Sequence, residues 1–165
     1  MALALPACAD LGVSVGAGEA PTVELPSISA DIDELDAALV TVTRDDGGTV
    51  ELAVRVADDS DARGRGLMGI RELPPDVGML FTWDGGEREG GFWMRDTLIP
   101  LDIAFVGADS RIEAVLSMVP CTSDPCPTYD PGIPYVAALE VPAGWFETND
   151  VEVGDQLTWV RASEG

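Results

Sequence analysis

The segment GFWMRDTLIPLDIAF, which begins at residue 91, sets charged, hydroxyl and aromatic side chains in one of the most apolar parts of the chain. The guanidinium of Arg95 would hold a carboxylate or phosphate through two parallel hydrogen bonds. Trp93 would offer a ring on which a sugar or another planar ligand stacks. Thr97 and Asp102 add polar atoms on the two sides of the turn that Pro100 marks. These four residues are our first candidates for ligand contact.

Asp96 and Asp102 also raise the question of catalysis. Two carboxylates in one cleft, roughly 5–10 Å apart, would serve as acid and base in glycoside hydrolysis. They would equally suit calcium alongside backbone carbonyls. The structural alternative is that they hold the turn, and that Arg95 pairs with one of them while the aromatic rings fill the core. The sequence leaves these alternatives open.

Arginines are concentrated just before this segment. Five of the nine cations lie within 33 residues, and the chain contains no lysine. Against an acidic background they would form one local positive pocket, in which we expect Arg63 and Arg65 to contact the ligand. The cations of this group are Arg63, Arg65, Arg71, Arg88 and Arg95.

Composition excludes several classes of function. The chain has no histidine, so Ser-His-Asp and Cys-His nucleophiles, and zinc held by histidine, are ruled out within it. It has neither a phosphate-binding loop that ends in Gly-Lys-Ser/Thr nor a dinucleotide fingerprint, and we expect no cofactor and no metal. Four methionines (Met68, Met79, Met94 and Met118) fit core packing better than copper binding. The net charge of −21 disfavours nucleic acid as a partner.

Cys121 and Cys126 lie in the turn-rich segment MVPCTSDPCPTYDP. Four intervening residues allow a short disulfide loop, and we predict that the two cysteines are bonded. A zinc half-site is the alternative, but the chain has no second pair of ligands for it. Reduced, inert thiols are the remaining possibility. A disulfide would indicate an oxidising compartment.

The amino terminus contains Leu-Pro-Ala-Cys, which resembles the lipobox of bacterial lipoproteins and makes Cys8 a candidate for lipidation. Residues 1–30 are expected to comprise this lipobox-like start and a flexible tether, since residues 9–30 are small, acidic and contain Pro and Gly. We therefore expect an exported lipoprotein of the cell envelope that meets the membrane only through its lipid anchor. The alternative is a cytoplasmic protein, because only five residues precede the first proline, too few for a signal peptide.

From residue 31 to residue 165 the pattern predicts a single all-β domain, a sandwich or barrel of about eight strands with two short helices. Asp45 to Gly48 mark a hairpin turn between the first two strands. The helices are expected at residues 58–68, capped by Asp58, Asp59 or Ser60, and at residues 143–147. The strands are expected at residues 38–43, 50–56, 79–83, 91–94, 101–106, 112–118, 135–141 and 156–160.

Four runs carry a resemblance to a known family: RGLMGIRELPPDVGMLFTW, GFWMRDTLIPLDIAFV, MVPCTSDPCPTYDPG and ALEVPAGWFETNDVEVGD. Together they resemble the domain of unknown function 192 family, over roughly residues 50–160. The resemblance implies a β-sandwich of jelly-roll type but no particular reaction. One position departs from the family pattern, since Ile70 stands where the family often has arginine.

These observations predict a cell-envelope binding module that takes a small anionic or carbohydrate ligand, or another envelope component, on an Arg/Trp surface. Two alternatives stay open. One is a hydrolase that acts on envelope carbohydrate through carboxylates. The other is a structural domain that binds a protein partner and has no small ligand. A deep pocket would favour a ligand or substrate, and a flat apolar patch would favour a protein partner.

Overall fold

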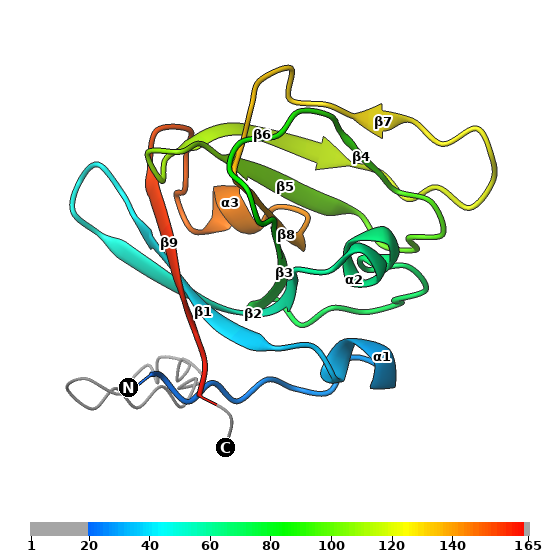
Figure 1. Cartoon of the computed structure of the whole chain (residues 1–165), viewed down its shortest axis with the longest axis horizontal. Helices are drawn as coiled ribbons and strands as arrows, with labels where there is room; N and C mark the ends of the chain where they lie inside the picture. Colours follow the sequence, from blue (N-terminus) through cyan, green and yellow to red (C-terminus); the bar gives the residue numbers. More distant parts are fainter. Residues whose placement is uncertain (1–19, 164–165) are drawn as a thin grey trace, which may run out of the picture.

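The computed structural model of the protein describes residues 20–163 and is built around one seven-stranded sheet (Figure 1). Its strands follow the spatial order β6-β5-β8-β3-β2-β1-β9, and two further short strands, β4 and β7, pair in a small second sheet. The strands are β1 (Ala37–Thr43), β2 (Thr49–Ala57), β3 (Val77–Thr82), β4 (Phe92–Trp93), β5 (Leu101–Val106), β6 (Ile112–Met118), β7 (Thr128–Tyr129), β8 (Ala137–Pro142) and β9 (Gln156–Arg161).

β1 and β2 form the predicted hairpin. The Arg44 amide donates to the Gly48 carbonyl at 2.8 Å, and Gly47 takes a φ of 85°, a left-handed conformation that favours glycine. β2 and β3 instead run parallel, with Ala53 opposite Val77. A parallel pair needs a crossover. Residues 58–76 supply it, and they carry Arg63 and Arg65, two residues of the candidate site.

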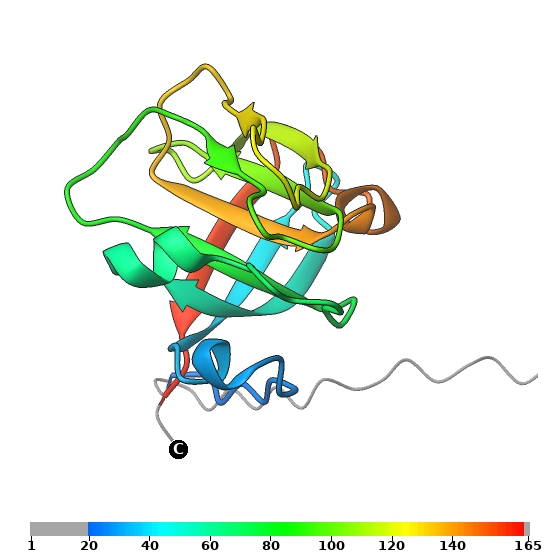
Figure 2. The same ribbon diagram turned by 90° about the vertical axis from the view of Figure 1, so that its right-hand side faces the viewer.

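The large sheet is curled around an inner core to which all seven of its strands contribute. Representative buried side chains are Val40 on β1, Leu52 on β2, Leu139 on β8 and Leu157 on β9. In Figure 2 the red β9 and the cyan β1 cross behind the orange β8. The outer strands meet at one end, where the Ile112 amide donates to the Asp155 carbonyl at 2.9 Å.

The fold is therefore an all-β sandwich, as predicted, and it is not closed into a barrel, since β6 and β9 remain the outer strands of the sheet. Eight of the nine strands lie where the alternation of apolar residues predicts them. β7 was not predicted, because two residues are too short for a period of two to show.

A second core covers the outer face of β3, β5 and β8. Alternation points Phe81, Ile103 and Phe105 outward, opposite to the inner-core side chains of the same strands. The β4–β7 ribbon, the segment after β2 and the residues before β1 close over this face (Figure 1). The candidate site lies within this outer layer.

The helices are short: α1 (Ala30–Asp33), α2 (Ser60–Arg65) and α3 (Trp145–Thr148). The predicted cap of α2 is confirmed, because the Asp59 carboxylate accepts hydrogen bonds from the amides of Asp61 and Ala62. α2 ends before the predicted residue 68, since Gly66 takes a φ of 50° and turns the chain. α3 begins two residues later than predicted, and α1 was not predicted at all.

Residues 20–30, which belong to the predicted tether, pack on the domain in this structure. Leu25 and Ile28 contact the outer core, and the Ser163 amide donates to the Pro21 carbonyl at 3.1 Å. Cys8 lies outside the described residues. Among residues 20–163, no helix is long and apolar enough to cross a membrane.

Candidate functional site

A small cavity of about 30 Å³, here called the inner hollow, lies on the outer face of the sheet. Glu140 of β8 forms part of its wall, together with residues from the α2 segment, β3, β4 and the loop after β4. Segments far apart in the sequence therefore converge on one carboxyl group. The lining residues are Arg63, Gly64, Arg65, Gly66, Leu67, Met68, Phe81, Phe92, Trp93, Thr97 and Glu140.

Glu140 is the most unusual titratable residue of the described chain. Leu139 and Val141 point into the inner core, so Glu140 points outward, in register with Met79 on β3 and Ile103 on β5. Only 5% of Glu140 is exposed, and burial raises the pKa of its carboxyl to about 8. Within residues 20–163 no hydrogen bond or ion pair reaches this carboxyl. It is therefore largely protonated and neutral at pH 7.

A larger depression of about 380 Å³, here called the outer groove, adjoins the inner hollow. The rings of Phe81, Phe92 and Tyr135 form its floor. Phe81 and Phe92 lie 5.0 Å apart in edge-to-face contact, and the buried Phe105 packs against Tyr135 at 4.9 Å. The Tyr135 hydroxyl donates to the Gly90 carbonyl at 2.9 Å. The structural interpretation of these rings is thus confirmed for the floor. The two cavities share Arg63, Gly64, Phe81, Phe92 and Trp93.

Trp93 differs from those rings because 51% of it is exposed. It lies on β4 opposite Thr128 of β7, and it lines both the inner hollow and the outer groove. The ribbon depends on Gly91, where a Cβ would come within 2.6 Å of the Tyr129 carbonyl oxygen. Such close pairing holds an exposed ring in position beside the cavities.

Arg63 is the cation best placed for a ligand. Its Nη1 donates to the carbonyls of Asp58 and Thr82, the second at 2.9 Å, and its guanidinium carbon lies 5.5 Å from the centre of the Trp83 ring. Arg88 lies over the same ring at 4.3 Å. These contacts fix the guanidinium without pairing it to a carboxylate. The positive charge of Arg63 is therefore not neutralised by an ion pair with a described residue.

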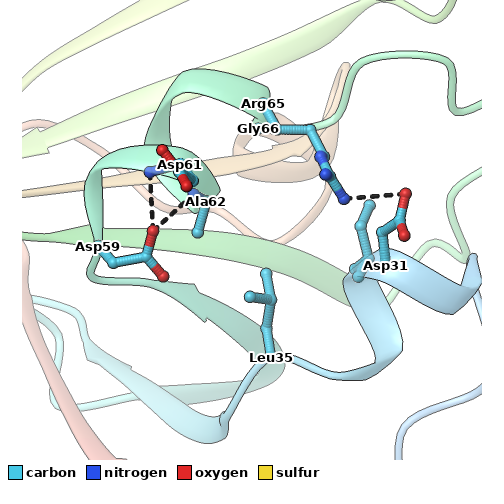
Figure 3. A pocket seen from close by; sticks show the side chains of 8 residues that line it. Asp31, Leu35, Asp59, Asp61, Ala62, Arg65 and Gly66 are labelled. Atoms are coloured by element: carbon cyan, nitrogen blue, oxygen red, sulfur yellow. Dashed lines mark hydrogen bonds and ion pairs between the residues drawn. The ribbon is translucent and has the colours of Figure 1, made fainter.

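Arg65 lines the inner hollow and also a neighbouring cleft between α1 and α2, shown in Figure 3. Its Nη1 lies 2.9 Å from the Asp31 carboxylate, which is exposed, as is Arg65 itself. Figure 3 also shows Asp59 bonded to the first turn of α2. The acidic side chains of this cleft thus act as a cap and an ion-pair partner. No group of three or more potential metal ligands occurs among residues 20–163.

Cys121 and Cys126 are bonded, with an S–S distance of 2.06 Å, so the predicted disulfide is confirmed. The disulfide loop supports the segment after β4. The backbone of Cys121 forms β-bridges with Arg95 and Thr97, and its carbonyl accepts a hydrogen bond from the Asp96 amide at 2.8 Å. Thr97 is buried and lines the inner hollow. The disulfide therefore braces one wall of the site, and it is typical of an oxidising environment.

Arg95 lies outside the inner hollow and the outer groove. Its guanidinium stacks over Trp93 at 5.6 Å and lies near the carboxylates of Asp124, at 3.4 Å, and Asp96, at 3.8 Å. Its side chain is 46% exposed, so these are surface ion pairs. The structural interpretation of Arg95 predicted an ion pair with Asp96 or Asp102. The structure shows the pair with Asp96, and Arg95 forms no ion pair with Asp102.

Asp102 lies on the opposite face of the sheet from this loop. It follows Leu101 and precedes Ile103, both of which point into the outer core, so its own side chain points toward the inner core. There its Oδ2 accepts a hydrogen bond from the Gly144 amide at 2.7 Å. Asp96, in contrast, belongs to the outer layer. The two carboxylates do not face each other across one cleft.

Of the six residues predicted to contact a ligand, the structure brings Arg63, Arg65, Trp93 and Thr97 around the inner hollow and leaves Arg95 and Asp102 outside it. The sequence interpretation missed Glu140. Its signal was a single carboxylate within the apolar run YVAALEVP. The methionines Met79, Met94 and Met118 lie in the outer core, where they serve as packing, and Met68 lines the hollow.

Comparisons with known proteins identify relatives of the whole domain. The profile of the domain of unknown function 192 family, described as "Uncharacterized ACR", matches residues 40–159. No curated protein matches the sequence. The chain is similar to a solved structure of a suspected transcription regulator from Sinorhizobium meliloti, with 32% identity and a TM-score of 0.70, over 76% of this chain and 95% of that one.

A second solved structure, a protein of unknown function from Novosphingobium aromaticivorans, is 31% identical, with a TM-score of 0.72, over 90% of this chain and all of that one. The family profile extends from β1 to β9 and includes the α2 segment and the disulfide loop. The resemblance read from the four sequence runs is thus confirmed. The chain belongs to the domain of unknown function 192 family.

Proposed function

We propose that this protein is a binding module of the cell envelope that holds a small anionic or carbohydrate ligand in the outer groove and the inner hollow. The observation that carries the proposal is the pair Arg63 and Trp93, which lines both cavities. Ligand sites are typically concave and mostly apolar, with a few fixed polar groups. The aromatic floor, the held guanidinium and the buried Glu140 match that description.

The chemistry of the wall favours a ligand that combines a ring or sugar body with an anionic group. An exposed tryptophan supplies area for stacking at low entropic cost, because it has only two side-chain torsions. The Arg63 guanidinium donates to backbone carbonyls and forms no ion pair with a carboxylate of residues 20–163. The chain as a whole carries a net charge of −21, so this local positive region is where an anion would bind.

The alternatives receive less support. A hydrolase that uses Asp96 and Asp102 would need both carboxylates in one cleft, and they lie on different faces of the sheet. A flat apolar patch for a protein partner would be expected to contain clustered apolar side chains, whereas the large exposed ones include Val119 and Val153, which belong to separate loops. Transcription regulation, suspected for the Sinorhizobium protein, is not proposed here, because the net charge opposes DNA binding.

Native mass spectrometry of the protein purified from its own cell extract tests the proposal. The wild-type protein should retain a small molecule, and Trp93→Ala should lose it while keeping its melting temperature, because the ring is half exposed. Val160→Ala, on exposed β9, is the matched control and should retain the molecule. If wild type and Trp93→Ala carry the same molecules, or none, the proposed function is wrong.

A further inference from the structure

We propose that the inner hollow receives a carboxylate of the ligand, and that Glu140 in its protonated form donates a hydrogen bond to that carboxylate. This inference rests on the proposed function and deepens it, since it names the chemical group that enters the hollow. It starts from the isolation of the Glu140 carboxyl, which is buried and has no hydrogen-bond or ion-pair partner among residues 20–163. A largely buried carboxyl without a partner in the protein invites an explanation.

The position of Glu140 shows where a partner would come from. β3 and β5 flank β8 with the apolar side chains of Met79 and Ile103, which offer no strong hydrogen bond. The remaining side of the carboxyl opens onto the inner hollow. A molecule in that hollow is therefore the group best placed to satisfy Glu140.

The charge on the wall decides between a cation and an anion. Besides Glu140, the charged residues that line the hollow are Arg63 and Arg65, both from the α2 segment, and Arg65 is paired with Asp31, so Arg63 supplies the unpaired charge. The lining residues from β3, β4 and the loop after β4, namely Phe81, Phe92, Trp93 and Thr97, carry no charge. Because burial raises the pKa of Glu140 to about 8, its carboxyl is largely a neutral donor at pH 7 and does not neutralise the Arg63 guanidinium. The hollow therefore favours an acceptor group with negative charge.

The size of the hollow selects among anions. One water needs roughly 10–15 Å³ of such space, so a cavity of about 30 Å³ accommodates about two waters, or a flat group with two oxygens. A tetrahedral phosphate with four oxygens is larger. A carboxylate also has two acceptor atoms, so one oxygen would accept from Glu140 and the other from a second donor on the wall.

Thr97 is a candidate for that second donor. Its hydroxyl makes only a long contact of 3.5 Å with the Arg95 carbonyl, so it is free to turn toward a ligand. The body of the ligand would then extend past Trp93 into the outer groove, since that ring lines both cavities. The ligand class that fits is a small sugar acid or a similar carboxylate with a stackable ring.

The test uses the full chain with acetate and glucuronate as carboxylate probes, and glucose and glucuronamide as neutral ones, followed by NMR titration of the Thr97 and Trp93 amides. At pH 6 both carboxylates should shift these signals, and glucuronate should bind at least tenfold more tightly than either neutral probe. Between pH 6 and pH 9 glucuronate affinity should fall about tenfold, because only the protonated fraction of Glu140 is competent.

Two variants separate the roles of Glu140. Glu140→Gln keeps a donor and should bind glucuronate with an affinity that no longer falls in the same way with pH, whereas Glu140→Leu should lose binding. Glu113→Gln, exposed on β6, is the control and should behave as wild type. Loss of binding in Glu140→Gln, equal binding of glucose and glucuronate, or no shift with either carboxylate at pH 6 would each overturn the inference. The proposed function fails separately, if Trp93→Ala does not alter ligand retention in the native mass spectra.

Discussion

Asp102 on β5 accepts a hydrogen bond from the Gly144 amide through its Oδ2 at 2.7 Å, which ties β5 to the turn before α3. Gly144 is the residue before α3 and takes a φ of 85°, so its amide is directed by a backbone conformation that favours glycine. The carboxylate is buried, and removal of one partner would leave this amide unsatisfied. The bond gives Asp102 a structural role that needs no ligand.

The first prediction follows from this bond. Asp102→Ala should lower the free energy of unfolding by about 1–3 kcal/mol, the usual scale for a buried hydrogen bond to a charged group. Asp102→Asn keeps an acceptor oxygen and should lose less. Urea denaturation measures both changes, with Asp76→Ala, an exposed substitution, as the control. An unfolding free energy for Asp102→Ala equal to that of the control would show that the bond is dispensable.

The second prediction concerns the pH dependence of stability at Glu140. The pKa of this carboxyl is about 8 in the folded protein, against an ordinary value of 4.5, so the folded state holds its proton more tightly than the unfolded chain does. The stability that this proton contributes is complete below about pH 4.5 and is lost as the pH rises to about 8. The total loss would be on the order of 5 kcal/mol or less, from a shift of this size.

Glu140→Gln removes this titration, so its unfolding free energy relative to wild type should rise steadily between pH 5 and pH 8. The difference between the two proteins is the quantity to measure, because other carboxylates titrate in the opposite sense. The pKa of Asp59, for example, is lowered by hydrogen bonds from the amides of Ala62 and Asp61, so its contribution is lost at acidic pH. Parallel curves for wild type and Glu140→Gln over this range would contradict the prediction.

The third prediction concerns Arg95. Its ion pairs with Asp96 and Asp124 are exposed, and such pairs contribute little to stability. Arg95→Ala should therefore change the free energy of unfolding by less than about 1 kcal/mol, and Arg95→Lys by still less. Thermal melts of both variants check this. A loss of several kcal/mol would mean that the guanidinium is buried in solution, as a structural anchor would be.

The fourth prediction concerns the disulfide. Replacement of Cys121 and Cys126 by serine should lower stability by roughly 1–2 kcal/mol, because the closed loop is short. The NMR signals of the Asp96 and Thr97 amides should shift as well, since the Asp96 amide donates to the Cys121 carbonyl and Thr97 forms a backbone β-bridge with Cys121. Unchanged signals at these two amides would show that the disulfide does not brace the inner hollow.

The fifth prediction concerns the attachment of the protein to the envelope. Cys8→Ser should abolish acyl labelling in the native cell and release the protein from the membrane fraction. An equivalent serine replacement of Cys126, far along the chain, is the control and should leave acyl labelling intact. Wild-type protein that takes up no acyl label, or that stays out of the membrane fraction, would favour the cytoplasmic alternative.

Much of the fold follows from local sequence pattern. β1 ends in alternating valine and threonine, β5 is an almost continuous apolar run, and the Asp-Asp-Gly-Gly turn between β1 and β2 needs the left-handed conformation of Gly47. These are near-neighbour effects, so they are visible in the sequence. The short spacing of Cys121 and Cys126 likewise favoured a local disulfide, which the structure confirms. Two of the shortest elements, β7 and α1, were missed because they are held by their neighbours rather than by a pattern of their own.

The candidate site depends on tertiary structure. Arg63, Trp93 and Thr97 were recognised by residue type, but only the crossover after β2 and the pairing of β4 with β7 bring them to one cavity. Asp102 looked equivalent to them until strand alternation placed it on the other face. Glu140 shows the limit most clearly, since a lone carboxylate in an apolar strand is unremarkable by itself. Its chemistry arises because β8 lies between β3 and β5 and distant segments bury the carboxyl, and desolvation by residues far apart in the chain cannot be read from a linear pattern.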